Sequence, residues 1–361
     1  MRRYEEDARQ MGIQGPTDRR DVARQRDLPG PMTHRERLEA TLAGEHADRP
    51  PVSFWHHFPG RDHTPQLLAK ETEAFYRRFD VDVVKLMPTG MYAVVDYGVE
   101  IRPADDEIGT TVYVAGPITQ LSDWATLPRV SPEGGTLAQQ VEVVRLVRAS
   151  LGPDVPIVQT IFSPLTMAAK LSGGALDDAF VADDALATTV LAQLADDVIA
   201  FGQACLDAGA DGFYFATQLA NRGTPAATYA RLGEPYDLRV LEALRARSWL
   251  LMLHLHGLEP SFDLADRYPV DIVSWEDRET PPSLSAALHQ TTRCLMAGLS
   301  RGELFVRGAK ADVAGQVQDA VAQTGGRRLI VAPGCVLSTT SREPLLRAII
   351  AAATGARVPD A

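Results

Sequence analysis

Eight short, strongly apolar runs recur along the chain, and long segments with helical periodicity separate them. The runs are PVSFWH (51–56), VDVVKLM (81–87), PIVQTIF (156–162), DGFYFAT (211–217), WLLMLHLH (249–256), VDIVSWE (270–276), RCLMAGL (293–299) and RLIVAPG (328–334). Nearly continuous apolar runs of this length are typical of parallel strands covered on both faces. Helices are predicted between them over 64–79, 137–151, 185–209, 237–247, 283–290 and 312–325.

Eight strand–helix units predict an α/β fold of the TIM (β/α)8 barrel type. An open, doubly wound sheet is the alternative, but no glycine-rich phosphate turn follows the first run. The segment GVEIRPADDEIGTTVYVAGPI (98–118) predicts a hairpin insertion after the second strand, above the catalytic face. Residues 1–32 read as a polar, disordered N-terminal arm, and residues 33–361 as one barrel domain.

Charge and cysteine content limit the partners. The 36 Lys and Arg residues against 47 Asp and Glu residues give a net charge of −11, so a nucleic-acid or anionic-membrane partner is not expected. No uninterrupted apolar run reaches the roughly 18 residues of a membrane span, and no secretory signal is recognisable. Three cysteines cannot build a disulfide framework, which favours the cytoplasm. Monomer and homodimer both remain open.

Polar side chains at the predicted strand ends identify a candidate metal site. His254 and His256 are two residues apart on the fifth strand, so both imidazoles can face the barrel mouth, where Cys335 follows the eighth strand. Two nitrogens and a thiolate suit a tetrahedral zinc site with an open fourth position, which Glu276 could fill. In the alternative reading, the histidines serve packing and backbone orientation and Cys335 is a buried thiol.

Other strand-end residues are candidates for catalysis and substrate binding. The predicted catalytic residues are His56, Arg278 and Glu276. His56 is predicted to move a proton, since imidazoles titrate near neutrality, and Arg278 to hold a substrate anion, although a structural salt bridge is the alternative. Lys85 lies in an apolar strand, where burial would make it nucleophilic unless a carboxylate pairs with it. The predicted substrate contacts are His57, Lys85, Tyr92, Phe162, Gln218 and Asp277.

Five segments together resemble the uroporphyrinogen decarboxylase superfamily over residues 33–356. They are RERLEATLAGEHADRPPVSFW (35–55), GADGFYFATQ (209–218), LHLHG (253–257), SWEDRETPPSL (274–284) and LIVAPGCVLSTTSREPLLRAI (329–349). The resemblance implies a TIM barrel. True decarboxylases of the family carry Arg-Gln-Ala-Gly-Arg-Tyr after the first strand, where this chain has HHFPGR (56–61). They also have an Asp near Pro88 or Thr89, and a His where this chain has Cys335.

The corrinoid-linked methyltransferase branch of the superfamily is the nearer resemblance. Its zinc ligands, a His-x-Cys and a distant Cys in a Pro-Gly-Cys turn, match His254 and Cys335, while His256 replaces the middle Cys. The resemblance implies zinc, a small-molecule substrate, and a corrinoid protein or another methyl donor. We therefore predict metal-dependent methyl or one-carbon transfer. The alternatives are a decarboxylase of a small acid or porphyrinogen-type substrate, and a non-catalytic barrel that binds a tetrapyrrole or corrinoid.

Overall fold

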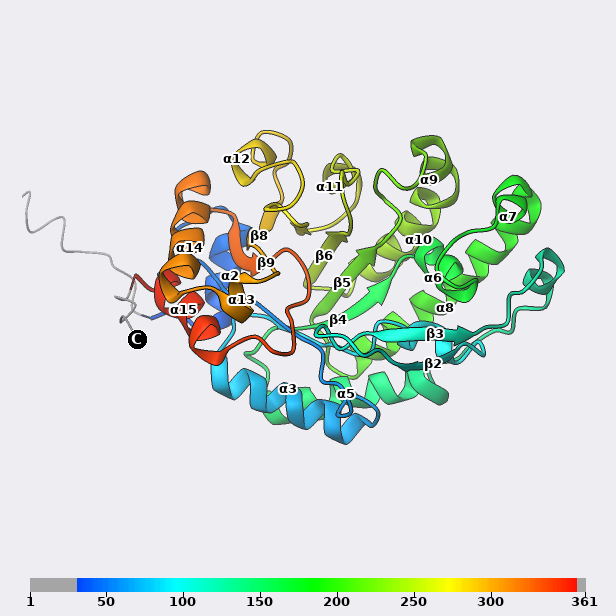
Figure 1. Cartoon of the computed structure of the whole chain (residues 1–361), viewed down its shortest axis with the longest axis horizontal. Coiled ribbons are helices and arrows are strands. Elements are labelled where there is room, and N and C mark those ends of the chain that lie inside the picture. The colour runs from blue at the N-terminus through cyan, green and yellow to red at the C-terminus, as the bar shows by residue number, and fades with distance from the viewer. Residues whose placement is uncertain (1–30, 356–361) are drawn as a thin grey trace, which may run out of the picture.

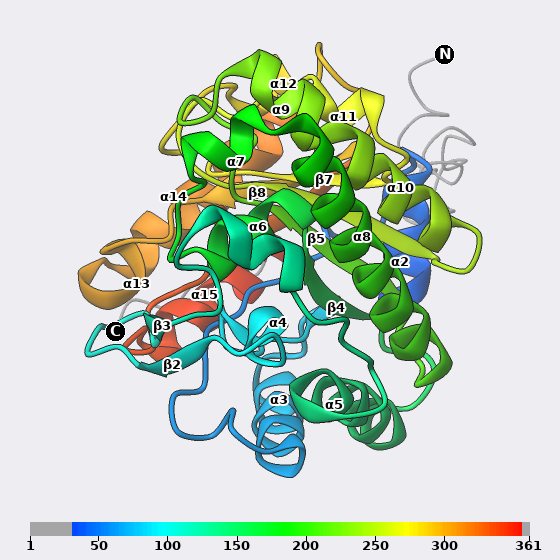
Figure 2. The same ribbon diagram turned by 90° about the vertical axis from the view of Figure 1, so that its right-hand side faces the viewer.

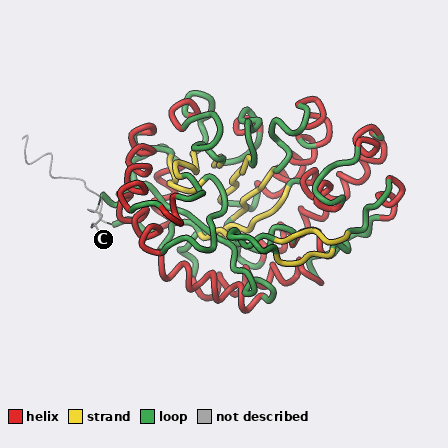
Figure 3. Tube along the Cα trace, viewed as in Figure 1, coloured by secondary structure: helices red, strands yellow, loops and turns green. Residues whose placement is uncertain are grey.

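A computed structural model describes residues 31–355, which form a curled parallel sheet surrounded by helices (Figures 1 and 3). Its seven strands lie in chain order and are β1 (Val84–Lys85), β4 (Ile157–Phe162), β5 (Gly212–Thr217), β6 (Leu250–Leu255), β7 (Ile272–Ser274), β8 (Cys294–Leu299) and β9 (Leu329–Pro333). Every residue of these strands is buried, as the continuous apolar runs predict. The predicted arm, residues 1–32, lies almost wholly outside the described residues.

The first predicted strand, 51–56, forms isolated bridges instead of a regular strand. Its backbone bonds to β9 on one side, from Ser53 N to Val331 O (3.1 Å) and from Val331 N to Pro51 O (2.8 Å). On the other side, Asp82 N donates to Val52 O (2.7 Å) just before β1. Pro51 has no N–H to donate, so the pairing with β9 cannot extend toward the amino-terminal side of this residue. The segment nevertheless joins both edges of the seven-stranded sheet, an arrangement consistent with a TIM barrel.

Long helices surround the sheet. They are α2 (His34–Leu42), α3 (Pro65–Phe79), α5 (Gly135–Leu151), α6 (Pro164–Leu171), α8 (Asp184–Asp207), α10 (Glu234–Arg245), α14 (Lys310–Thr324) and α15 (Glu343–Ala353). Five of them lie where helices were predicted (64–79, 137–151, 185–209, 237–247 and 312–325), and those at 34–42, 164–171 and 343–353 were not predicted. The shorter elements are α4 (Tyr92–Val95), η2 (Leu121–Thr126), α7 (Asp178–Ala182), α9 (Ala226–Leu232), α11 (Leu264–Arg267), α12 (Leu284–Ala287) and α13 (Leu304–Arg307). The helix predicted over 283–290 is shorter because His289 and Gln290 make bonds to residues i−3.

Helix α8 is, within the described residues, the one helix long and apolar enough to pass a length-and-composition test for a membrane span. Half of the apolar window that passes the test is buried inside the protein, and the helix packs against α5, α6 and α10. A core helix of a barrel has the same properties.

The predicted insertion is a hairpin of β2 (Glu100–Pro103) and β3 (Thr111–Ala115), paired antiparallel outside the main sheet (Figure 2). The Asp106 carboxylate fixes its turn by accepting from the backbone N–H groups of the next residues, including Gly109 (2.7 Å). Ser338 and Thr339 donate their hydroxyls to Glu107 O (3.0 and 2.9 Å). These bonds tie the hairpin tip to the loop after β9, on the side of the strands' carboxyl ends.

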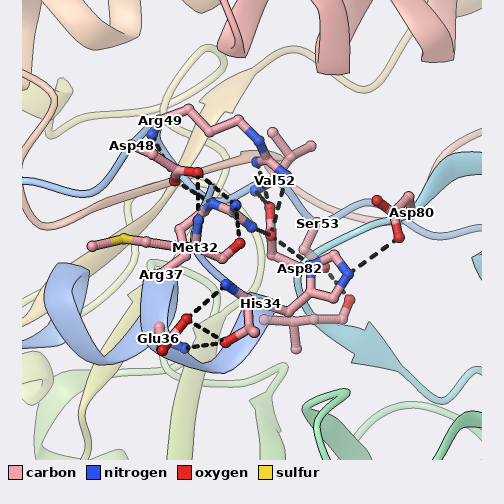
Figure 4. Close-up of polar contacts among 12 residues, drawn as sticks. Met32, His34, Glu36, Arg37, Asp48, Arg49, Val52, Ser53, Asp80 and Asp82 are labelled. Atoms are coloured by element: carbon pink, nitrogen blue, oxygen red, sulfur yellow. Dashed lines mark hydrogen bonds and ion pairs between the residues drawn. The ribbon is translucent and has the colours of Figure 1, made fainter. Parts of the chain in front are cut away.

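The segment 51–56 closes the sheet between β9 and β1, and we call it the closing segment. A buried ionic cluster holds its amino-terminal end (Figure 4). The Asp82 carboxylate accepts from Arg37 Nη1 (2.5 Å), Arg49 Nη1 (2.6 Å) and Val52 N (2.7 Å). Arg37 also donates to Asp48 (2.7 Å). The cluster gives the DRPPV sequence (48–52) a physical role, because both of its charged side chains join helix α2 and the start of β1 to the segment that closes the sheet.

A second buried carboxyl, Asp237 on α10, accepts from the hydroxyls of Tyr229 (2.5 Å) and Tyr268 (2.8 Å). Burial raises the pKa of Asp237 to about 7, and the two tyrosine bonds only partly oppose that rise. The group joins α9, α10 and the end of α11 on the outside of the barrel.

Candidate metal centre and its cavity

A cavity of about 390 Å³ opens at the carboxyl ends of the strands. Side chains from four strands, from the loop after β9 and from the hairpin line it, among them Lys85, Phe162, Ala216, His254, Cys335 and Thr111. Parallel α/β barrels place their functional groups at this end. The cavity lies toward the lower end of the size range of small-molecule sites.

The structure brings the three predicted ligands together in this cavity. Nitrogen atoms of His254 and His256 and the sulfur of Cys335 all lie within 4.8 Å of one another. Cys335 Sγ is 3.9 Å from His256 Nδ1. Strand alternation explains the pairing of the two imidazoles, since β6 sends residues i and i+2 to the same face.

The environment of the cluster suits metal ligation. Burial lowers the pKa values of His254 and His256, so both imidazoles are neutral and keep a lone pair. Burial raises the pKa of the Cys335 thiol, so a metal ion would have to displace its proton. Two neutral imidazoles and one sulfur form a donor set that zinc accepts, so the residues present fit the ion that the sequence predicts.

Glu276, predicted as a catalytic residue and possible fourth ligand, lies beside His256. Its Oε1 is 3.7 Å from His256 Nδ1, and its Oε2 accepts from Arg301 Nε (3.0 Å). The loop that carries Cys335 passes very close to this side chain, because a Cβ at Gly334 would lie 2.6 Å from the Cα of Glu276. Glycine is therefore required here for the close approach.

His56 is the last residue of the closing segment, and His57 follows it. His57 lines the cavity and His56 does not. His56 packs against the rings of Phe58 and Phe75, with its Nδ1 bonded to His57 O (2.6 Å). Burial and the nearby Lys85 lower the pKa of His57 to about 4, so its imidazole is neutral. The structure thus places His57, and not the predicted His56, in the cavity; a proton-carrying role for either stays a prediction.

Arg278, Asp277 and Tyr92 lie outside the cavity. Arg278 donates to Gly298 O (2.8 Å) and pairs with Asp319 (2.6 Å), which agrees with the salt-bridge alternative and leaves no anion-holding position at the mouth. Asp277 accepts from Gly298 N (2.9 Å), and the Tyr92 hydroxyl donates to Thr160 O (2.5 Å) within the core. These three side chains stabilise loops and packing.

Lys85, Phe162 and Gln218 do line the cavity, as do several side chains that the sequence analysis missed. The missed ones are Trp55, Lys170 and Arg301, together with the hairpin residue Thr111. The scarcity of lysine could have identified Lys170, since the chain has only four lysines and two of them line this cavity.

A curled parallel sheet with a cavity and a cluster of potential metal ligands at the strands' carboxyl ends defines the TIM-barrel-like class of α/β proteins. Within that class, the chain belongs to the uroporphyrinogen decarboxylase (URO-D) family, whose model matches residues 33–355.

The relatives include two kinds of enzyme. Uroporphyrinogen decarboxylase of Rhodococcus erythropolis is 31% identical over 50% of this chain and 51% of its own length, so the match spans about half of that relative. Methylcobamide:CoM methyltransferase MtbA of Methanosarcina mazei is 22% identical over 68% of this chain and 77% of that protein. A solved methyltransferase from Methanosarcina mazei superposes with a TM-score of 0.75 at 20% identity, covering 90% of this chain and 99% of that one. That likeness shows the fold.

Proposed function

We propose that this protein is a zinc-dependent enzyme that transfers a methyl or other one-carbon group to or from a small substrate. The observation that carries the proposal is the convergence of two imidazoles and one thiol within 4.8 Å at the cavity wall. Zinc held by His254, His256 and Cys335 would act as a Lewis acid that increases the ionisation of a thiol or oxygen nucleophile.

The chain's own residues prepare the cavity for that chemistry. Glu276, itself bonded to Arg301, lies 3.7 Å from Nδ1 of His256, the nitrogen that also faces Cys335, so its carboxylate is placed to complete the ligand set. His57 is neutral and lines the same cavity; burial and the nearby Lys85 lower its pKa to about 4, which makes it a weak base, so we assign it the orientation of a nucleophile by hydrogen bonding. The aromatic faces of Trp55 and Tyr214 exclude water from the inner wall.

The methyltransferase relatives support the reaction class. MtbA is named for a methylcobamide donor, and by likeness we propose a corrinoid protein or another methyl donor as the partner of this chain, in the cytoplasm. Because His256 stands where that branch has Cys, the proposed site has one sulfur ligand instead of two. One sulfur ligand donates less electron density to the metal than two. A substrate thiolate would therefore be less nucleophilic here.

The test is metal analysis of the purified full chain, prepared without added metal and after zinc supplementation. We expect about one zinc per chain by the ligand count. Cys335→Ser and His254→Ala should lose the metal, whereas the matched control Cys294→Ser should keep it, because Cys294 is buried at the start of β8 and outside the cavity lining. Absence of zinc from both preparations of the wild type would remove the proposal.

Decarboxylation of a small acid is the second candidate, and the charges of the cavity favour it. The lining holds Lys85, Lys170 and Arg301, of which Arg301 pairs with Glu276 just behind the lining, and it contains no Asp or Glu, which suits an acidic substrate. A porphyrinogen with many carboxylates would meet few cations in a cavity of about 390 Å³. Release of carbon dioxide from small acids by metal-free protein would favour this candidate over the first.

A further inference from the structure

Lys85 is a buried amine that the proposed methyl transfer does not use. It ends β1 and points into the cavity, with a side chain only 8% exposed. Its Nζ lies 2.6 Å from Met87 Sδ, 4.5 Å from the ring centre of Tyr214 and 5.0 Å from that of Trp55. A thioether and two aromatic faces stabilise an ammonium group weakly compared with water or a carboxylate.

No acidic side chain compensates this burial. The cavity lining contains no Asp or Glu, and none of the ion pairs among residues 31–355 includes Lys85. Burial lowers the pKa of Lys85 to about 7, although the nearby Cys335 opposes the shift slightly. At neutral pH the neutral, nucleophilic fraction of this amine is therefore about a thousandfold larger than that of an exposed lysine.

Lys170 offers an internal comparison in the same cavity. It comes from α6 and lies at the partly exposed wall, 3.8 Å from Met91 Sδ and 4.6 Å from the ring centre of Phe162. Burial lowers its pKa less, to about 8. Of the two lysines, only Lys85 belongs to the barrel strands, where Trp55 and Tyr214 restrict a bound molecule and His57 lines the same cavity.

We propose that Lys85 binds a small aldehyde or ketone covalently, as an imine. The amine lone pair forms the N–C bond to the carbonyl carbon, and the C–O bond breaks. The oxygen leaves as water with the two hydrogens of the amine, and the imine nitrogen takes a proton from solvent to become an iminium. The step is a condensation and needs no oxidant or reductant.

An iminium at this position would withdraw electrons from the neighbouring carbon. The substrate class that benefits is a small β-keto acid, whose loss of carbon dioxide leaves a carbanion equivalent beside the iminium. The lining without carboxylates, with Lys170 near the mouth, suits the acid group of such a molecule. The inference goes beyond the proposed methyl transfer and does not depend on zinc.

The test is borohydride trapping with acetoacetate, followed by peptide mass spectrometry of the full chain. Only four lysines are present, so the label is assigned directly. We expect the reduced adduct on Lys85 at least about tenfold above that on exposed Lys70, in metal-free and in zinc-loaded protein alike. Lys85→Met should abolish the label, while Lys170→Met and the surface control Lys70→Met should keep it.

Each other outcome would overturn the inference. A label spread evenly over the lysines, a label concentrated on Lys170, or no label above a sample without borohydride each excludes a covalent role for Lys85. Because wild-type mapping alone identifies the residue, the result stands even if the Lys85→Met variant does not fold. The zinc content is measured separately, so failure here and failure of the metal proposal are distinguishable.

Discussion

Replacing Asp82 by Ala should strongly destabilise the barrel, because it removes the acceptor at the centre of the buried cluster. Arg49 loses its carboxylate partner, and the N–H of Val52 loses its acceptor. Arg37 keeps Asp48, which limits the damage on that side. Removing one partner of a buried ion pair costs about 3–5 kcal/mol, so we expect a loss of that size in the free energy of unfolding.

The matched control is Asp80→Asn, because Asp80 has φ +52° at the left-handed C-cap of α3, a conformation that Asn adopts more readily than Ala. Asp80 lies two residues away, is 73% exposed, and contacts the other side of the His34 imidazole (3.1 Å). An exposed pair of this kind contributes about 0–1 kcal/mol. Urea unfolding followed by circular dichroism measures both variants against the wild type. If the two variants lie within about 1 kcal/mol of each other, the cluster does not close the sheet as argued.

The pH dependence gives a second check on the same cluster. Burial alone would raise the pKa of Asp82, but bonds from His34 and Arg49 lower it on balance. A lowered folded-state pKa means that the stabilisation is present above the ordinary value near about 4 and is lost as the pH falls through the folded-state value. The wild type should therefore lose stability on acidification more steeply than Asp82→Ala.

Three further outcomes are expected. Because the folded-state pKa of Asp237 is about 7, ionisation of this carboxyl should lower the free energy of unfolding by roughly 4 kcal/mol as the pH rises from about 4 to 7. Urea titrations at about pH 5 and 8 should show a smaller pH dependence of that free energy in Asp237→Asn. Gly334→Ala, whose Cβ would meet Glu276, should cost about 1–3 kcal/mol and reduce zinc content, whereas Gly315→Ala, with open space, should not. Zinc at a hundredfold above its Kd would stabilise the folded state by about 3 kcal/mol, and a chelator removes that contribution. A chelator should therefore lower the Tm of the wild type but not that of Cys335→Ser.

Each of these outcomes has a result that contradicts it. An unchanged pH profile in Asp237→Asn would mean that this carboxyl is not the group that titrates. Equal zinc content in the two glycine variants would mean that the close approach to Glu276 does not position the metal site. A chelator effect of the same size in wild type and Cys335→Ser would place the bound metal elsewhere.

The sequence predicted the strands and long helices well because a parallel barrel buries both faces of each strand. Continuous apolar runs are then unambiguous, as for 250–255 and 294–299. The exception is the segment 51–56, which was predicted as a strand but forms isolated bridges. Pro51 in this segment has no N–H to donate to a neighbouring strand. Period-2 alternation also paired His254 with His256 correctly, because their spacing does not depend on where the strand begins.

The sequence alone could not show which member of a pair of similar residues enters the cavity. His56 and His57 face opposite sides, and which one enters the cavity depends on the register with β9, fixed by tertiary bonds. Likewise, two arginines follow adjacent strands. Arg278 turns back to α14, whereas Arg301 reaches the cavity, and only the loop paths decide between them.

The segment that completes the sheet also carries Trp55 and His57 into the cavity. Its other end is fixed by the charges around Asp82, far from the chemistry but on the same few residues of backbone. A change at that distant end can therefore shift the inner wall of the cavity without touching any residue that lines it. Variants selected for altered substrate choice should accumulate there as well as in the cavity itself.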